Sequence, residues 1–171
     1  GNINGIAGME TALIGTAKRN VRITGKVVRI EGIIEGNLTL LADTVTISEK
    51  ASIGGTVRLI ADKAIMEGTI EGDLHVTAGT LLTLEGTIGG DAHIQARETL
   101  IADGLRVAGD FTYRTDQILI IDPAQVGGTI LKDDAGSAVS PFSIAQLKSR
   151  GLWLFAAFLV GALSLRLFPW P

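Results

Sequence analysis

Apolar and polar residues alternate in short runs along most of the chain, and glycines separate the runs. Leu38-Thr-Leu-Leu41 and Val57-Arg-Leu-Ile60 show the pattern, in which Val, Ile, Leu and Thr dominate. A period of two is typical of strands with one buried face. A helix does not fit, because glycine recurs too often to leave an apolar face with a period of 3.6 residues. The pattern therefore predicts short strands over about the first 130 residues.

A short motif, [G/A]-x-[I/V]-x-G, recurs along this region, one residue longer in its fifth copy. Its closing glycines are 19, 17, 18, 19 and 19 residues apart: Gly36, Gly55, Gly72, Gly90, Gly109 and Gly128. A polar residue and an alternating strand follow nearly every one of them. A second apolar run lies midway through the units, as in Thr44–Ile47, Leu81–Leu84 and Ile118–Ile121. A unit of about 18 residues with three short strands fits one coil of a β-solenoid. We predict six such coils.

Stacking the coils places equivalent residues in ladders about 4.8 Å apart per rung. One ladder is predicted to point inward, and the neighbouring one outward. The inward ladder is Leu38, Val57, Leu74, Ala92 and Phe111, and the outward ladder is Thr39, Arg58, His75, His93 and Thr112. The interior is expected to be narrow, because no Phe, Tyr or Trp precedes Phe111 and large aromatic residues normally fill a wide core.

The repeats resemble those of bactofilins, the polymer-forming cytoskeletal proteins of bacteria. The similarity is clearest in Val28-Arg-Ile-Glu-Gly-Ile-Ile-Glu-Gly-Asn-Leu38 and in Met66-Glu-Gly-Thr-Ile-Glu-Gly-Asp-Leu74. Gly109–Arg114 followed by Ile121–Gly128 is similar to a membrane-bound branch whose repeat leads into transmembrane helices. The resemblance implies a right-handed, three-sided β-helix and a scaffolding role without catalysis. Soluble bactofilins lack a long apolar tail, which is where this chain departs from them.

The C-terminal segment is a candidate membrane span. Residues 151–165 carry no charge, and about 20 residues are needed to cross a bilayer. Continuing to Trp170, with Arg166 reaching towards the interface, supplies that length. A buried amphipathic helix that packs on the end of the solenoid is the alternative. The side chains expected in the membrane are Trp153, Leu154, Phe155, Phe158, Leu159, Leu163, Phe168 and Trp170.

We therefore divide the chain into four parts: an N-terminal lead-in or cap (1–20), a β-helix (21–131), a linker (132–142), and a juxtamembrane and transmembrane helix (143–171). By the positive-inside rule, Lys148 and Arg150 before the span favour a cytoplasmic solenoid. The sequence begins without Met, however, and in the membrane-bound relatives the preceding segment resembles a signal peptide, which would place the solenoid outside the cytoplasm. We expect the bacterial cell membrane, with the β-helix on the extracytoplasmic, periplasmic side.

Composition excludes several classes of protein. Among 171 residues, 46% are hydrophobic and 19% charged, which is incompatible with an intrinsically disordered chain. A net charge of −3 gives no electrostatic basis for nucleic-acid binding. With no cysteine, the chain has neither disulfides nor thiolate metal ligands.

Candidate chemistry is sparse, and each candidate has a plainer interpretation. His75 and His93 stack on adjacent rungs, and β-helical carbonic anhydrases bind zinc through three histidines; here a third is lacking. Asp73, Asp91 and Asp110 form a column that is able to hold Ca²⁺, although Asp after Gly is also usual in tight turns. A column of Glu31, Glu67 and Glu85 is interpreted in the same way. Hexapeptide-repeat acyltransferases are the main enzyme family that offers an alternative interpretation, but the coil length varies too much for their strict six-residue period. We expect no catalytic residue, metal or cofactor.

The solenoid ends are the remaining candidates for function, because end strands carry unpaired edges. The polar residues 131–137 are expected to cover the C-terminal end. The N-terminal end is expected to contact another molecule through Ile3, Ile6, Met9, Leu13 and Ile14, so that Lys at Ile6 and Leu13 should leave a monomer. These features predict a membrane-anchored scaffold that assembles with itself. The alternatives are an accessory subunit docked on other integral membrane proteins, and a β-helical enzyme.

Overall fold

The structure is a computed structural model that describes residues 3–6 and 9–133. These residues lie in one compact unit, Gly1–Asp133. The linker, juxtamembrane and transmembrane parts predicted beyond residue 133 lie outside the described residues. Within the part that is described, no helix is long and apolar enough to cross a bilayer.

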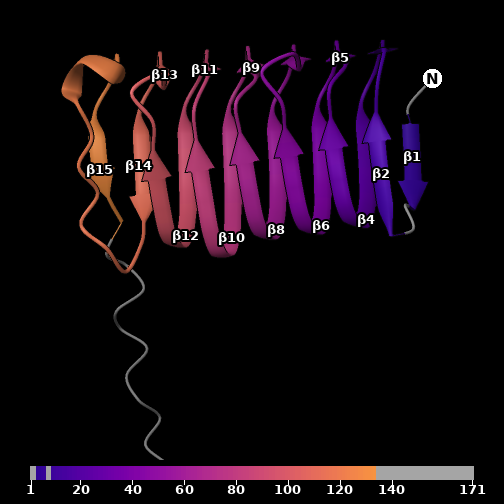
Figure 1. The fold of residues 1–171 in the computed structure, drawn as a ribbon. Helices are drawn as coiled ribbons and strands as arrows, with labels where there is room; N and C mark the ends of the chain where they lie inside the picture. The colour runs from indigo at the N-terminus through magenta and orange to yellow at the C-terminus, as the bar shows by residue number, and fades with distance from the viewer. Residues whose placement is uncertain (1–2, 7–8, 134–171) are drawn as a thin grey trace, which may run out of the picture. The chain divides into compact units, whose positions relative to one another are not determined.

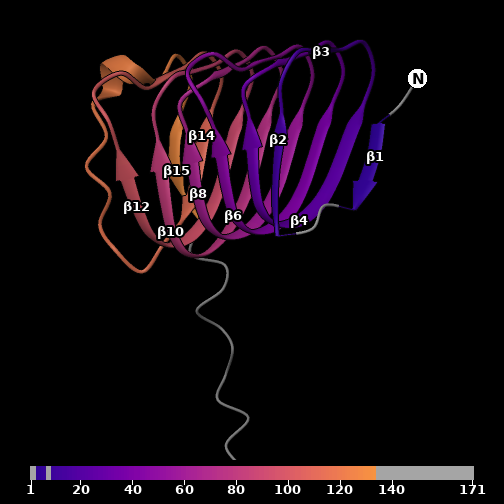
Figure 2. The same cartoon turned by 45° about the vertical axis from the view of Figure 1, so that its right-hand side comes forward.

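Each coil combines one long strand with one very short strand (Figure 1). The long strands are β4 (Val21–Ile30), β6 (Leu38–Ile47), β8 (Val57–Met66), β10 (Leu74–Leu84) and β12 (Ala92–Ile101). The short strands are β5 (Ile33–Ile34), β7 (Ser52–Ile53), β9 (Thr69–Ile70), β11 (Thr87–Ile88) and β13 (Arg106–Val107). Figure 2 shows how the long strands bend, so that each one follows more than one side of its coil.

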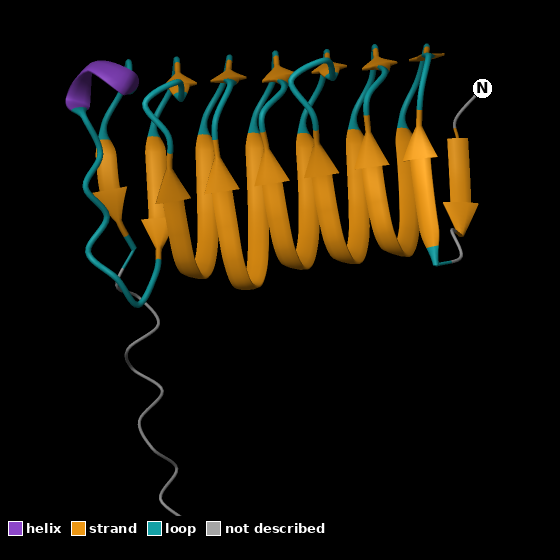
Figure 3. Cartoon of the chain, viewed as in Figure 1, coloured by secondary structure: helices purple, strands orange, loops and turns teal. Residues whose placement is uncertain are grey.

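The two ends vary this scheme. The first coil has three separate strands, β1 (Ile3–Ile6), β2 (Glu10–Leu13) and β3 (Thr16–Ala17). The last coil contains β14 (Phe111–Arg114) and a 3₁₀ helix, η1 (Pro123–Gln125), before β15 (Ile130–Lys132) begins a further turn (Figure 3). The solenoid therefore has about seven coils, one more than the glycine spacing delimits, because residues 3–17 form a coil of their own.

All strand pairs are parallel, as a solenoid requires. One sheet runs β1-β4-β6-β8-β10-β12-β14-β15, with β2 also paired to β4, and the second runs β13-β11-β9-β7-β5-β3. The register confirms both predicted ladders. Leu38, Val57, Leu74, Ala92 and Phe111 are successive partners and fully buried, and Thr39, Arg58, His75, His93 and Thr112 are successive partners on the outer face. The right hand of the coil stays a prediction.

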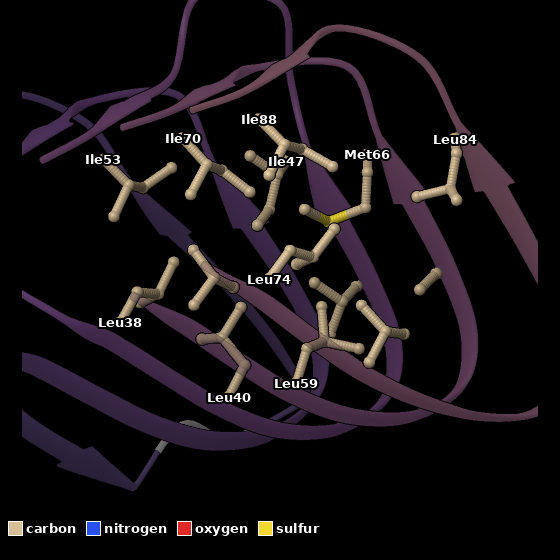
Figure 4. Packing of buried hydrophobic residues seen from close by; sticks show 14 of the residues in the cluster. Leu38, Leu40, Ile47, Ile53, Leu59, Met66, Ile70, Leu74, Leu84 and Ile88 are labelled. Atoms are coloured by element: carbon tan, nitrogen blue, oxygen red, sulfur yellow. The ribbon is translucent and has the colours of Figure 1, made fainter. Parts of the chain in front are cut away.

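The core is a column of aliphatic side chains (Figure 4). Ile30, Ile47, Met66 and Leu84 occupy four successive layers and are all buried. Phe111 is the one fully buried aromatic residue in the described part, and it lies in the last coil. This packing confirms the narrow interior, since stacked coils of branched side chains fill the space without large rings.

Differences in coil length are absorbed at turns and bulges. The partners of β10 shift register between Ala78 and Leu81, so Gly79 and Thr80 bulge outward while the flanking residues keep their ladders. Longer coils instead place their extra residues at a corner, where the Ala51 N–H donates to the Ser48 carbonyl. The core columns therefore remain aligned although the repeat varies from 17 to 19 residues.

Two local predictions are wrong. Ile118–Ile121, the apolar run expected as the middle strand of its coil, is not a strand, because no neighbouring strand pairs with it. Residues 131–132, expected in a polar loop, lie in β15 and pair with β14. The alternation Ile130-Leu131-Lys132 after Gly128 repeats the start of every earlier coil, so the backbone continues the ladder.

Candidate functional site

The aspartate column is a hydrogen-bonded ladder between coils. The Oδ1 atom of Asp73 accepts from the backbone N–H of Asp91, that of Asp91 from Asp110, and that of Asp110 from Thr129, at 3.0, 2.9 and 2.7 Å. Asn20 and Asn37 do the same in the earlier coils. Since one Oδ1 of each residue is bonded to the next coil, the column joins the coils at the turn. The described residues contain no group of three or more His, Asp or Glu arranged to hold a metal ion.

This ladder explains the glycine that precedes each turn residue. A Cβ placed on Gly90 would overlap Oδ1 of Asp73 and crowd the backbone of Gly72. Gly109 and Gly128 meet the carboxylate of the preceding coil in the same way. The Gly-Asx pair is therefore a structural requirement for close coil stacking, which supports the turn interpretation of these residues.

His75 and His93 lie where the repeat predicts them. Their ring centroids are 5.0 Å apart and the ring planes are inclined by 24°, which is a stacked arrangement. Arg58 and Thr112 occupy the flanking rungs. Two stacked imidazoles on one face leave a metal ion without the third protein ligand that a catalytic zinc needs.

The same face carries a shallow groove of about 320 Å³. Its floor is the surface of β8, β10, β12 and β14, with Ile60 and Tyr113 among its lining side chains. Arg114 is paired with Asp133 at its edge, Nη2 to Oδ2 at 2.6 Å. The groove is open and mostly apolar, and it resembles an ordinary sheet surface more than an enclosed active site.

The glutamate column is interrupted. Glu31, Glu67 and Glu85 occupy equivalent turns, since their N–H groups donate to Leu13, Ile47 and Met66 of the preceding coils, but Ser48 takes the rung between the first two. Glu31 is also paired with Arg29, at 2.5 Å between Oε1 and Nε. The column is thus a set of corner residues on a charged surface.

The N-terminal end combines an unpaired edge with exposed apolar side chains. β1 and β2 pair with β4 on one side, and no described strand covers their other side. Met9 is 80% exposed and Ile14 is 73% exposed, and Ile3 is exposed as well. Leu13 differs, because it is half-buried and packs against the core. Ile6 ends β1, and its side chain lies outside the description.

The family model for bactofilin, described as polymer-forming and cytoskeletal, matches residues 10–112. The match runs from β2 to β14 and covers more than half of the chain. The chain belongs to the bactofilin family. No curated protein and no solved structure matches the chain.

Membership of the bactofilin family agrees with the geometry. The family is a structural one, and the described residues form a parallel, repetitive solenoid that suits such a role. The matched region contains the histidine pair, all three column aspartates and the whole glutamate column, which lie on surfaces or turns of the repeat. A structural function accounts for each of them.

Of the two predicted site groups, the N-terminal one differs from the expectation at Leu13, and the membrane one lies outside the described residues. Met9 and Ile14 form the exposed part of the N-terminal end, whereas Leu13 belongs to the core. The membrane residues Trp153–Trp170 lie outside the described residues, so the bactofilin domain neither supports nor opposes them. The sequence reasoning missed the hydrogen-bonded Asx ladder, although the Gly-[Asn/Asp] pairs at one repeat spacing were its signal.

Proposed function

We propose that this bactofilin is a non-catalytic, membrane-anchored scaffold whose solenoids associate through their N-terminal ends. The observation that carries the proposal is the exposure of Met9 and Ile14 on a coil whose outer edge is not paired by any strand of residues 3–6 and 9–133. An end of this kind favours association with the end of another solenoid, because the contact buries apolar surface and lets the backbone groups of the two edges pair.

The test compares end and side substitutions. Met9→Lys with Ile14→Lys places two charges on the proposed contact without touching the core. Leu41→Lys with Ile60→Lys is the matched control, since these residues are 49% and 56% exposed and lie on an outer ladder two and three rungs in from Ile6 of β1. Leu13→Lys is avoided, because it would unfold the first coil.

Analytical ultracentrifugation and electron microscopy of the full chain in mild detergent give the readout. The end variant should remain monomeric, and the side variant should assemble like the unchanged protein. If both assemble equally well, the N-terminal contact is wrong. Purification from native membranes in a fixed ratio with other membrane proteins would instead make the chain an accessory subunit of a complex.

Membrane attachment rests on the apolar segment 151–170 and its flanking tryptophans, Trp153 and Trp170. We place the protein in the bacterial cell membrane, with the solenoid outside the cytoplasm. Because the chain has no cysteine, Lys63→Cys on the exposed face of β8 gives a single reporter. A membrane-impermeant maleimide should label it in cells whose outer barrier is opened. Labelling only after lysis would place the solenoid in the cytoplasm.

A further inference from the structure

The last full coil pairs with only the first half of β12, the long strand of the coil before it. β14 pairs with β12 only along Ala92–Gln95. The second half of β12, Glu98–Ile101, pairs with β10 on one side, and no strand in the described part of the chain pairs with it on the other. Alternate residues of a parallel strand bond to opposite neighbours, and the Ala102 N–H donates back to Leu84. Thr99 and Ile101 therefore direct their backbone groups to the open side.

Residues 115–122, which we name the end segment, run past this open edge. Two side-chain hydrogen bonds attach the chain to the preceding coil, one at the start of the end segment and one just after it. Oγ1 of Thr115 donates to the carbonyl of Arg97 at 3.0 Å, and Nε2 of Gln125 donates to the carbonyl of Ala102 at 2.9 Å. Between these two points the end segment is not a strand (Figure 3). Among residues 3–6 and 9–133, neither this stretch of chain nor the edge beside it has a strand partner.

The coil that contains the end segment has a regular length. Gln95 is opposite Arg114, and Val107 is opposite Val126, so the offset between coils is 19 residues on both flanks. If the same offset held in between, Ile118 would lie opposite Thr99, and Ile120 opposite Ile101. Both positions belong to the buried core columns.

The structure instead has the opposite orientation. Ile118 is 89% exposed and Ile120 is 93% exposed, whereas Leu119 and Ile121 are half-buried, and Ile121 packs against the core. A slip of one residue exchanges the two faces of a strand. Both faces of Ile118-Leu-Ile-Ile121 are apolar, so either set is able to fill the columns.

We propose that the end segment is a strap with two registers. In the open register, Ile118 and Ile120 face outward and the edge of β12 is free. In the closed register, they enter the core columns and the segment pairs with Glu98–Ile101, which seals this end of the solenoid. The strap thereby controls whether an unpaired β-edge is offered at the end opposite the N-terminal contact. It does not depend on the proposed self-association.

Two double variants bias the strap in opposite directions. Ile118→Asp with Ile120→Asp is compatible with the open register, because both side chains are exposed there. It excludes the closed register, because two carboxylates would be buried in the core columns. Leu119→Asp with Ile121→Asp has the reverse effect. Amide hydrogen exchange in the full chain, followed at Thr99 and Ile101, reports pairing of the edge.

The first variant should speed exchange at Thr99 and Ile101 by about tenfold, and the second should slow it, while Thr83 in β10 changes in neither. Unchanged exchange in the first variant would overturn the proposal, because a permanently open segment tolerates two exposed aspartates. A disulfide test is independent of stability. Thr99→Cys with Ile118→Cys should cross-link on mild oxidation as His93→Cys with Thr112→Cys does, since the latter pair is already in register. Failure of the first pair alone would also overturn it.

Discussion

The Oδ1 atom of Asp91 accepts a hydrogen bond from the backbone N–H of Asp110, one coil further along, at 2.9 Å. The side chain of one turn thus satisfies the backbone of the next turn, and the same relationship is repeated from Asp73 to Thr129. In a solenoid, stability is close to a sum of coil stabilities and nearest-neighbour contacts. Each of these hydrogen bonds therefore stabilises the interface between two neighbouring coils.

Asp91→Ala should lower the free energy of unfolding by about 1 kcal/mol, since it leaves the Asp110 N–H without its partner. Asp91→Asn should stay near the unchanged protein, because Asn keeps the Oδ1 acceptor, as Asn20 and Asn37 do. Urea denaturation followed by circular dichroism measures both. Equal losses in the two variants would show that the charge, and not the hydrogen bond, is what matters.

Gly90→Ala should destabilise the fold by about 1–3 kcal/mol, because the new Cβ overlaps the Asp73 carboxylate and crowds Gly72. Combining it with Asp73→Ala should recover part of the loss, since one of the two clashes disappears. The double variant should therefore lose less stability than the sum of the two single variants, because Asp73 and Gly90 are in contact across neighbouring coils. Additive losses would contradict the packing described here.

Leu74→Ala should cost about 2–5 kcal/mol, because Leu74 is fully buried between Val57 and Ala92 in the inward ladder. His75→Ala, on the outer face one residue later, is the control and should change stability little. Thermal unfolding distinguishes the two. A similar effect of both substitutions would mean that the register is shifted by one residue.

Gln125→Ala should loosen the last coil more than the rest of the solenoid. The buried side chain of Gln125 donates to the Ala102 carbonyl at 2.9 Å and holds η1 against the preceding coil. We expect faster hydrogen exchange over residues 115–126 and unchanged exchange in β6 and β8, because end coils open independently of central ones. A uniform change along the chain would instead indicate global destabilisation.

The sequence determined the coil, its ladders and the stacked histidines, because strand alternation has a fixed period of two and the glycine motif marks each turn. Positions such as Leu74 and His75 follow from counting alone. The sequence also placed the chain in the right family, since turn residues and apolar columns recur at one spacing.

Only the tertiary structure decided which apolar runs find a partner. Ile118–Ile121 has a better strand sequence than many paired segments, yet it lies unpaired, because pairing depends on the neighbour and on a register that two equally apolar faces do not specify. Leu13 and Ile14 are similar in sequence, but one packs against the core and the other faces solvent. Local pattern sets the period of a solenoid, whereas its ends depend on what lies beside them.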